Sequence, residues 1–223
     1  MKLSILIPVY NENKTVLRNT ISTINKLPVD TEIIIYNDGS VVTYCDLLED
    51  KQLNISRLVE CTQNHGKGYA IRAMISFATG DYCIVQDADG ELNPNDIPKL
   101  IKATKCNLYN AVYGYRDFSK CKPLYRFGNK FLNWFLNNLY PIYVTQVKDL
   151  ECGYKLIRTS LLKSLNLQSD GFNIESEITC KLLNICIPIQ QVPVSYTPRT
   201  NGKKMKVHYG LSTLWTIVKY RFL

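Results

Sequence analysis

The sequence predicts an α/β fold in which helices flank a mostly parallel central sheet. Short, almost wholly apolar runs recur through the first half of the chain, and segments with helical periodicity separate them. Strands as apolar as these are typical of parallel sheets that are covered on both faces. A chain of 223 residues can bury a sizeable core. No linker or repeat interrupts it, so we expect a single domain over residues 1–223.

The predicted elements follow one another in regular order. In the first half, strands are expected at 3–9, 31–37, 55–61, 82–87 and 110–115, and helices at 13–27, 66–79 and 95–105. In the second half, helices are expected at 125–140, 174–185 and 209–223, with an edge strand that prolines limit at 187–196. The last helix combines aromatic, apolar and basic residues, so it could either pack on the domain or lie on a membrane surface.

Charge and cysteine content bound the partners and the compartment. The chain carries 27 Lys and Arg against 19 Asp and Glu, a net charge of +8, which suits an anionic partner but also fits a merely basic surface. Eight cysteines without a C-x-x-C pair favour reduced thiols over a zinc site or a disulfide framework. The N-terminal apolar run is short and contains a proline, which indicates a strand and not a signal peptide. We therefore expect a cytoplasmic protein, either soluble or peripheral at the cytosolic face of a membrane.

Polar clusters follow each of the first four predicted strands. In chain order they occupy residues 10–12, 37–40, 64–68 and 87–89. The carboxyl ends of parallel strands meet at one edge of a sheet, and ligands of open α/β sheets bind there. The sequence therefore predicts that these four loops form one binding crevice.

Asp87 and Asp89 stand one residue apart at the end of an apolar run, and no lysine lies near them in the sequence to neutralise them. Such a pair can hold Mg²⁺ or Mn²⁺ together with phosphates. By itself the spacing is a weak motif that a solvated Asp-Gly turn also explains, but its place beside the other three polar loops favours the metal. Asp38, in NDGS, leaves a similar choice between a nucleotide contact and a turn. The segment NHGKG brings backbone N–H groups and Lys67 to a helix start, which suits an anionic phosphate. Neither a P-loop nor G-x-G-x-x-G occurs.

The segments IPVYNE, NDGS, NHGKG, GDYCIVQDADGE and VYGYR, in this order, resemble the inverting family 2 glycosyltransferases with a GT-A fold. Further along, DLECGYKLIR, SDGFNIESEITCKLL, VPVSYTPRTNGKKMK and LWTIVKYRF resemble the polyprenyl-phosphate sugar transferases, the branch similar to dolichyl-phosphate mannosyltransferase. The resemblance covers nearly the whole chain. It implies metal-dependent transfer of a hexose from a nucleotide-diphosphate sugar, either GDP-mannose or a UDP-sugar, to polyprenyl or dolichyl phosphate.

For the donor, the resemblance implies a nucleotide-sugar-binding half at 1–115. The residues that would line the base and the ribose are Pro8, Tyr10, Asn11, Glu12 and Asp38, with Gly66 and Lys67 near the nucleotide. Asp87 and Asp89 would hold the Mg²⁺ or Mn²⁺ that bridges the two phosphates and stabilises the leaving group as a Lewis acid.

For the acceptor, the resemblance implies an acceptor-side half at 116–208, followed by an amphipathic helix at 209–223. The cations that would bind the acceptor phosphate are Arg116, Arg126, Arg199 and Lys203. Asp149 would orient the donor or act as a base, and it completes the expected catalytic set with Asp89 and Arg116. Reaching a lipid acceptor would require binding to the membrane surface or to a membrane-protein partner.

Two alternatives and two open points remain at this stage. A lipid phosphate is already ionised, whereas a sugar hydroxyl needs a base, so a family 2 enzyme that extends a glycan with Asp149 as base is one alternative. The other is a non-catalytic nucleotide-sugar or nucleic-acid-binding module, although no stacking-aromatic motif supports nucleic acid. Asn37 stands where relatives usually carry Asp, which could alter nucleotide affinity. Glu175 and Glu177 could be functional or could only cap their helix.

Overall fold

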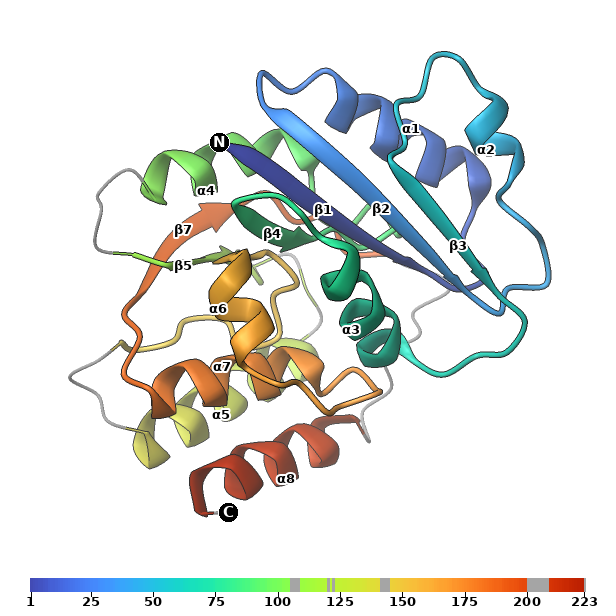
Figure 1. The fold of residues 1–223 in the computed structure, drawn as a ribbon. Helices are drawn as coiled ribbons and strands as arrows, with labels where there is room; N and C mark the ends of the chain where they lie inside the picture. Colours follow the sequence, from blue (N-terminus) through green and yellow to red (C-terminus); the bar gives the residue numbers. More distant parts are fainter. Residues whose placement is uncertain (105–108, 120, 122, 141–144, 200–208, 223) are drawn as a thin grey trace.

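The computed structural model describes residues 1–104, 109–119, 121, 123–140, 145–199 and 209–222. In this part of the chain, one seven-stranded sheet runs through the molecule in the order β3-β2-β1-β4-β6-β5-β7 (Figure 1). The strands are β1 (Lys2–Val9), β2 (Asp30–Asp38), β3 (Arg57–Cys61), β4 (Tyr82–Val85), β5 (Ala111–Arg116), β6 (Lys155–Arg158) and β7 (Ile189–Val194).

Strand direction brings most carboxyl ends to one edge of the sheet. β1 pairs in parallel with β2 and β4, β2 with β3, and β5 with β7. β6 is antiparallel to both of its neighbours, β4 and β5, so β5 runs in the same direction as β4. The prediction of a mostly parallel sheet is confirmed, and the loops after β1 to β4 therefore emerge on the same side.

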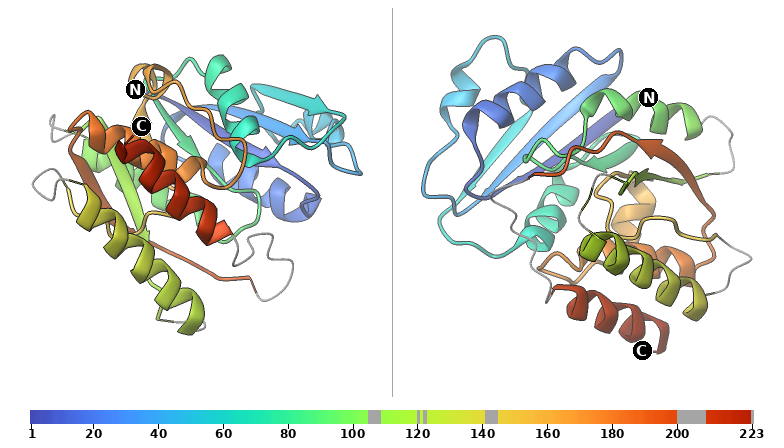
Figure 2. Two further views of the ribbon diagram at one scale, coloured as in Figure 1. Left: turned by 90° about the horizontal axis from the view of Figure 1, so that it is seen from below. Right: turned by 180° about the vertical axis from the view of Figure 1, so that it is seen from behind.

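Helices cover both faces of the sheet (Figures 1 and 2). One face carries α1 (Lys14–Asn25), α2 (Asp46–Glu49) and α4 (Ile97–Thr104), which follows the short 3₁₀ helix η1 (Pro94–Asp96). The other face carries α3 (Lys67–Phe77), α5 (Pro123–Leu139), α6 (Thr159–Ser164), α7 (Ile174–Asn184) and α8 (Tyr209–Phe222). α8 packs against α7 and α5. None of the helices in the described residues is long and apolar enough to cross a membrane.

Alternation along the buried strands separates two hydrophobic cores. In β1, Leu3, Ile5 and Ile7 pack with α1 and α4, whereas Leu6 packs with α3 on the opposite face. A strand with apolar residues on both faces reads as an uninterrupted apolar run, which is why β1 was predictable from the sequence. Packing on both faces fixes the strand register and thus the positions of the loops that follow the strands.

The predicted elements are present with ends shifted by a few residues, and β7 lies at the edge of the sheet as expected. The sequence did not predict α2, β6 or α6. These elements have four, four and six residues, too few for a helical or alternating period to be recognised.

Candidate active site

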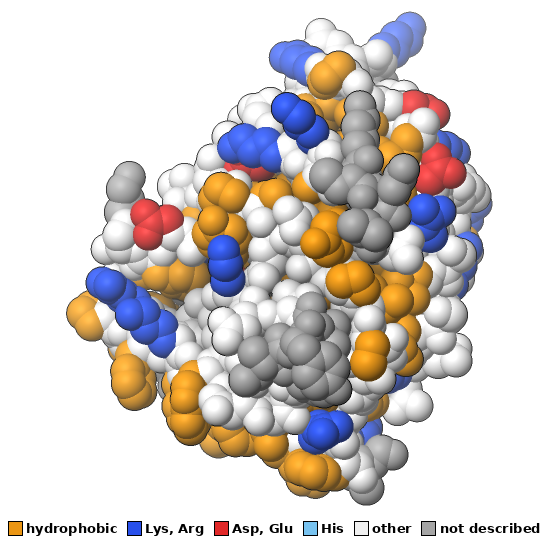
Figure 3. All heavy atoms as spheres, turned by 90° about the vertical axis from the view of Figure 1, so that its left-hand side faces the viewer, with side chains coloured by type: hydrophobic (Ala, Val, Ile, Leu, Met, Phe, Trp, Pro, Cys, Tyr) orange, Lys and Arg blue, Asp and Glu red, His pale blue; other side chains and the backbone are white. Residues whose placement is uncertain are grey.

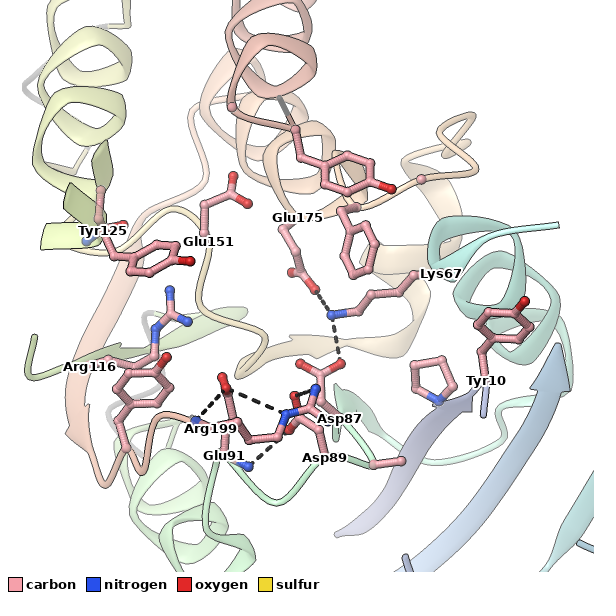
Figure 4. A pocket seen from close by; sticks show the side chains of 18 of the residues that line it. Tyr10, Lys67, Asp87, Asp89, Glu91, Arg116, Tyr125, Glu151, Glu175 and Arg199 are labelled. Atoms are coloured by element: carbon pink, nitrogen blue, oxygen red, sulfur yellow. Dashed lines mark hydrogen bonds and ion pairs between the residues drawn. The ribbon is translucent and has the colours of Figure 1, made fainter. Parts of the chain in front are cut away.

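A cavity of about 670 Å³ opens at the carboxyl edge of the sheet and extends toward α5 and α8 (Figure 4). Each of the four predicted polar loops contributes to its wall. The contributions are Tyr10 and Glu12 after β1, Asp38 at the end of β2, Asn64, Gly66 and Lys67 after β3, and Asp87 and Asp89 after β4. Pro8 of β1 also lines the cavity. The convergence predicted from strand direction is therefore present.

Asp87 and Asp89 each contact a cation from a distant part of the chain. Lys67 Nζ, at the start of α3, lies 2.7 Å from Asp87 Oδ1. Arg199 Nη2, in the segment after β7, lies 2.9 Å from Asp89 Oδ2. No lysine lies near this pair in the sequence, but the fold supplies two cations from distant parts of the chain.

Arg199 joins a cluster of carboxylates. Its Nη1 lies 3.2 Å from Glu12 Oε2, and its backbone N–H donates to Glu91 Oε1 at 3.0 Å. Burial, followed by the charges of Asp87 and Glu91, raises the pKa of Asp89 to about 6 although Arg199 opposes the shift. The negative charge of the cluster therefore exceeds what its own cations offset.

The carboxylate oxygens of Asp87 and Asp89 fit a divalent cation. Carboxylate oxygens are the ligands that Mg²⁺ and Mn²⁺ prefer, and Mg²⁺ is commonly held by one or two carboxylates plus substrate phosphates. The described residues contain no group of three or more His, Cys, Asp or Glu side chains arranged as metal ligands. A site formed by Asp87 and Asp89 that takes its other ligands from phosphates does not require such a group.

Asp38 shapes the loop that begins α3. Its Oδ2 accepts hydrogen bonds from the Gly66 N–H at 2.7 Å and from Asn64 Nδ2 at 3.0 Å, and its Oδ1 accepts from the His65 N–H at 3.0 Å. Gly66 has a φ of +107°, and a Cβ there would lie 2.3 Å from the Asp170 carbonyl oxygen, so only glycine fits. Asp38 therefore holds the NHGKG loop in place at the cavity wall.

Asn37 has a structural reason to differ from Asp. Its side-chain amide donates to Glu60 Oε2 and its Oδ1 accepts from the Ser40 N–H. An aspartate at this buried position would face the Glu60 carboxylate and repel it. Among the described residues the cavity wall does not include Asn37, so the departure matches an internal partner.

Arg116 and Asp149 form a bidentate pair at the end of the cavity that extends toward α5. Arg116 Nε donates to Asp149 Oδ2 at 2.7 Å and Nη2 donates to Oδ1 at 2.9 Å. The aromatic rings of Phe118 and Tyr196 lie 4.9 and 5.1 Å from the guanidinium carbon. Burial opposes the charge, but Asp149 holds the pKa of Arg116 well above its usual range. Arg116 lines the cavity, while Asp149 is 2% exposed and lies behind it.

Two residues of the predicted site, Asn11 and Arg126, do not line the cavity. Asn11 bridges the loops after β1 and β2, with its backbone N–H donating to Ser40 Oγ at 2.8 Å and its Oδ1 accepting from the Val41 N–H at 2.9 Å. Arg126 is exposed on α5 and does not line the cavity. Lys203 lies outside the described residues.

Glu151 and Glu175 both line the cavity. Sequence reasoning assigned Glu151 no site role and left Glu175 open between a functional role and a helix cap. Glu175 contacts Lys67, whereas Glu177, two residues along α7, accepts from the backbone N–H groups of Gln168 and Ser169. Glu177 is therefore structural, and Glu175 faces the site. Both are acidic residues in the first turn of one helix, so no local sequence signal distinguishes them.

Aromatic and aliphatic side chains make up the wall of the cavity near α5 and α8. They are Leu124, Tyr125, Phe127 and Leu132 of α5, Phe172 before α7 and Tyr209 of α8. In Figure 4, Tyr125 lies beside Arg116 on the side of the cavity opposite Tyr10. The cavity is thus carboxylate-rich at one end and apolar with an arginine at the other.

Comparisons with known proteins identify the family. Residues 4–165 match the model described as glycosyl transferase family 2. The chain belongs to this family. It is 27% identical over 234 residues to the dolichyl-phosphate beta-glucosyltransferase of Saccharomyces cerevisiae, covering 91% of this chain and 69% of that protein. This chain is also 26% identical over 227 residues to the undecaprenyl-phosphate 4-deoxy-4-formamido-L-arabinose transferase of Edwardsiella ictaluri, covering 95% of this chain and 64% of that protein.

The fold agrees with this assignment. Glucosyl-3-phosphoglycerate synthase of Mycobacterium tuberculosis, in a crystal structure with UDP, superposes with a TM-score of 0.77 at 18% identity, covering 99% of this chain and 80% of that chain. Another crystal structure of the same enzyme contains Mn²⁺, UDP and glucosyl-3-phosphoglycerate. The predictions of a GT-A fold and of a glycosyltransferase are therefore confirmed, and the family 2 glycosyltransferase is an enzyme and not a binding module.

Proposed function

We propose that this family 2 glycosyltransferase transfers a hexose, with inversion, from a nucleotide-diphosphate sugar to polyprenyl phosphate. One observation carries the proposal: a single cavity connects the Asp87–Asp89 pair to Arg116 and to the aromatic side chains of α5. A charged donor suits the first end, and an acceptor with a phosphate and an apolar chain suits the second. Relatives named for dolichyl and undecaprenyl phosphate support this choice of acceptor.

At the donor end, Asp87 and Asp89 would hold Mg²⁺ or Mn²⁺ together with the diphosphate. When bound, the ion stabilises the charge that develops on the leaving nucleoside diphosphate. Pro8, Tyr10 and Glu12 would line the nucleoside, with the loop that Asp38 holds beside them. UDP-glucose is the first donor to test, because a relative is named as a glucosyltransferase and the fold neighbours bind UDP.

At the acceptor end, Arg116 would bind the acceptor phosphate, with Arg199 beside it. An ionised phosphate can attack the anomeric carbon without a general base, on the face opposite the leaving group. The glycan-extending alternative assigned the base to Asp149, yet both carboxylate oxygens of Asp149 accept from Arg116. This arrangement favours Asp149 as the residue that orients Arg116 and therefore favours the phosphate acceptor.

The exposed surface of α5 supports a lipid-bearing acceptor. This helix buries Asn133, whose side chain bonds the Lys148 carbonyl and the Leu150 N–H. It also buries Leu136, yet it exposes large apolar side chains, with Phe127 69% and Trp134 60% exposed. In a soluble protein the exposed face of such a helix usually carries polar side chains.

α8 likewise leaves large apolar side chains exposed. It buries Thr213, Thr216 and Ile217 and exposes Leu211, Trp215 and Phe222. Hydrophobic side chains with Lys and Arg among them lie along the lower edge of the face in Figure 3, the end of the molecule where α5 and α8 lie in Figure 1. Tryptophan with basic residues is typical of a surface that lies in the membrane interface. We propose that α5 and α8 bind the membrane at the cytosolic face and bring the cavity to its acceptor.

The test is a donor-by-acceptor activity matrix with Mn²⁺ or Mg²⁺. UDP-glucose, UDP-N-acetylglucosamine and GDP-mannose would be crossed with a short polyprenyl phosphate, simple sugars and water, and the product would be identified by mass spectrometry. Transfer to the lipid phosphate alone is the expected result, and it would also name the donor. Transfer only to sugars would overturn the acceptor assignment while leaving the metal site in place.

A further inference from the structure

A row of alternating charges lies between the two ends of the cavity. Glu175 is 2% exposed, and its Oε1 lies 3.3 Å from Lys67 Nζ while its Oε2 lies 3.0 Å from Lys155 Nζ. Lys155 is itself fixed, since it donates to the carbonyls of Leu150 at 2.8 Å and Cys152 at 2.6 Å. One lysine therefore holds each oxygen of Glu175, which fixes the orientation of the carboxylate at the cavity wall (Figure 4).

Glu175 retains unused hydrogen-bonding capacity. Its two contacts are ion pairs, and neither buried oxygen accepts a hydrogen bond from the described residues. An ionised carboxylate offers about four acceptor sites, and leaving them unmade in a buried position costs free energy. A ligand with several hydroxyl groups would supply the missing donors.

Glu151 forms the second carboxyl of this part of the wall. The hydroxyls of Ser176 on α7 and Thr213 on α8 both donate to its Oε1, at 3.2 and 3.3 Å. Burial is the main cause that raises the pKa of Glu151. A carboxyl that takes up a proton can donate a hydrogen bond as well as accept one. Glu151 can therefore bind a hydroxyl group either by accepting its hydrogen or by donating to its oxygen.

The position of the two glutamates determines what they can bind. Lys67 connects Glu175 directly to Asp87, where the diphosphate and its metal would lie. Arg116, where the acceptor phosphate would lie, is on the far side of Glu151 in Figure 4. The group transferred between leaving diphosphate and attacking phosphate must occupy the space between them, and that group is the hexose.

We propose that Glu175 and Glu151 bind the hydroxyl groups of the donor hexose and thereby select which sugar is transferred. The inference rests on the proposed donor class, a nucleotide-diphosphate sugar, and does not depend on the acceptor. A site that hydrogen-bonds a substrate hydroxyl rejects analogues without it far more strongly than an apolar pocket rejects a missing methylene. These two carboxyls therefore determine sugar specificity, and the residues around Asp38 contact the nucleoside.

The first experiment compares calorimetric binding of UDP and of UDP-glucose in the presence of Mn²⁺. Glu175→Gln is expected to weaken UDP-glucose binding roughly 10- to 100-fold relative to UDP, because a hydrogen bond to a charged group is lost. Glu177→Gln is the matched control: it lies on the same helix, is buried and ion-paired to Lys181 at 2.7 Å, but does not face the cavity. Its ratio of UDP-glucose to UDP affinity should equal that of the wild type.

A second pair of variants keeps the test valid if Glu175→Gln fails to fold. Glu151→Gln and Thr213→Val alter the second carboxyl or its support. Thr216→Val is the control, because the two hydrogen bonds that it loses, from Asn173 and to the Ser212 carbonyl, involve neither glutamate. Deoxy analogues of UDP-glucose then identify which sugar hydroxyl each glutamate binds. The wild type should bind the analogue without that hydroxyl more weakly than UDP-glucose, whereas the variant without the glutamate should bind both equally.

Three outcomes separate the possibilities. A selective loss of UDP-glucose affinity in the Glu175 and Glu151 variants supports the sugar subsite. Equal weakening of UDP and UDP-glucose, or no change, overturns it, because the glutamates would then act only through Lys67 and Asp87 or not at all. If UDP, UDP-glucose, GDP and GDP-mannose all fail to bind the wild type, the donor class itself is wrong, and the inference falls with it.

Discussion

α1 and α8 are helices of similar length, 12 and 14 residues, that distribute their apolar residues differently. α1 packs Leu17, Ile21 and Ile24 into the core and exposes its polar side, whereas α8 packs Thr213, Thr216 and Ile217 inward and exposes Leu211 and Trp215. An exposed group of large apolar side chains is typical of a surface that contacts a partner. A helical pattern in the sequence therefore does not by itself say which of its apolar residues enter the core.

The largest effect is expected from breaking the donor end. Asp89→Asn removes a charged metal ligand but keeps the shape of the side chain, so it should lower transfer by roughly 10²- to 10³-fold through loss of stabilisation of the leaving diphosphate. The measurement is the initial rate with saturating donor and polyprenyl phosphate in detergent. Asp170→Asn, an exposed carboxylate paired with Arg72 outside the cavity wall, is the control. A rate within a few-fold of the wild type would show that Asp89 holds no catalytic metal.

Breaking the acceptor surface should separate membrane binding from donor binding. The double variant Trp134→Gln, Trp215→Gln removes two exposed tryptophans, and we expect binding to anionic vesicles to fall by roughly tenfold per tryptophan. UDP-glucose affinity in solution should not change. Val41→Gln is the control, since Val41 is 91% exposed but lies in the loop after β2 and not on α5 or α8. Undiminished vesicle binding by the double variant would mean that α5 and α8 do not contact the membrane.

The features of the fold and the site that depend on hydrophobic periodicity and on strand direction were predicted from the sequence. Apolar runs gave β1 to β5, and their parallel order placed Asp38, Lys67, Asp87 and Asp89 at one edge of the sheet. The amphipathic pattern also located α8, but a pattern alone does not say which face is buried. Which face is buried depends on the partners that the neighbouring elements offer. In α8, the hydroxyl of the buried Thr213 donates a hydrogen bond to the Glu151 carboxyl.

Partners that approach through the fold were beyond the reach of the sequence. Arg199 lies 110 residues from Asp89, and no local signal connects them. Asn37 likewise reads as a lost charge until Glu60, on the neighbouring strand β3, is seen to accept its amide hydrogen bond. Such charge pairs decide which carboxylates are free for a metal, and they require the three-dimensional structure.

A smaller effect should appear in the pH dependence of stability. The pKa of Asp89 is raised from 3.8 to about 6, so the folded state binds this proton more tightly than the unfolded state. The stability it contributes is complete below pH of about 4, is lost as the pH rises through about 6, and amounts to roughly 2–3 kcal/mol. Asp89→Asn lacks this titration and should be more stable than the wild type at neutral pH without metal, with the gap closing toward pH of about 4. Urea unfolding at several pH values measures it, and a variant less stable at neutral pH would contradict the assignment.

The smallest effect concerns Arg199, which connects the two regions by reaching from the segment after β7 to the carboxylates of the donor end. Its guanidinium competes with a divalent cation for Asp89, so Arg199→Met should raise the affinity for Mn²⁺ without nucleotide by roughly two- to tenfold, as expected for a partly exposed ion pair. Arg18→Met, which breaks a pair with Asp50 that is not part of the cavity wall, should leave that affinity unchanged. Mn²⁺ titration followed by electron paramagnetic resonance gives both values. Weaker Mn²⁺ binding by Arg199→Met would mean that Arg199 positions the carboxylates for the metal. Arg199 would then belong to the donor site only and would not connect the two regions.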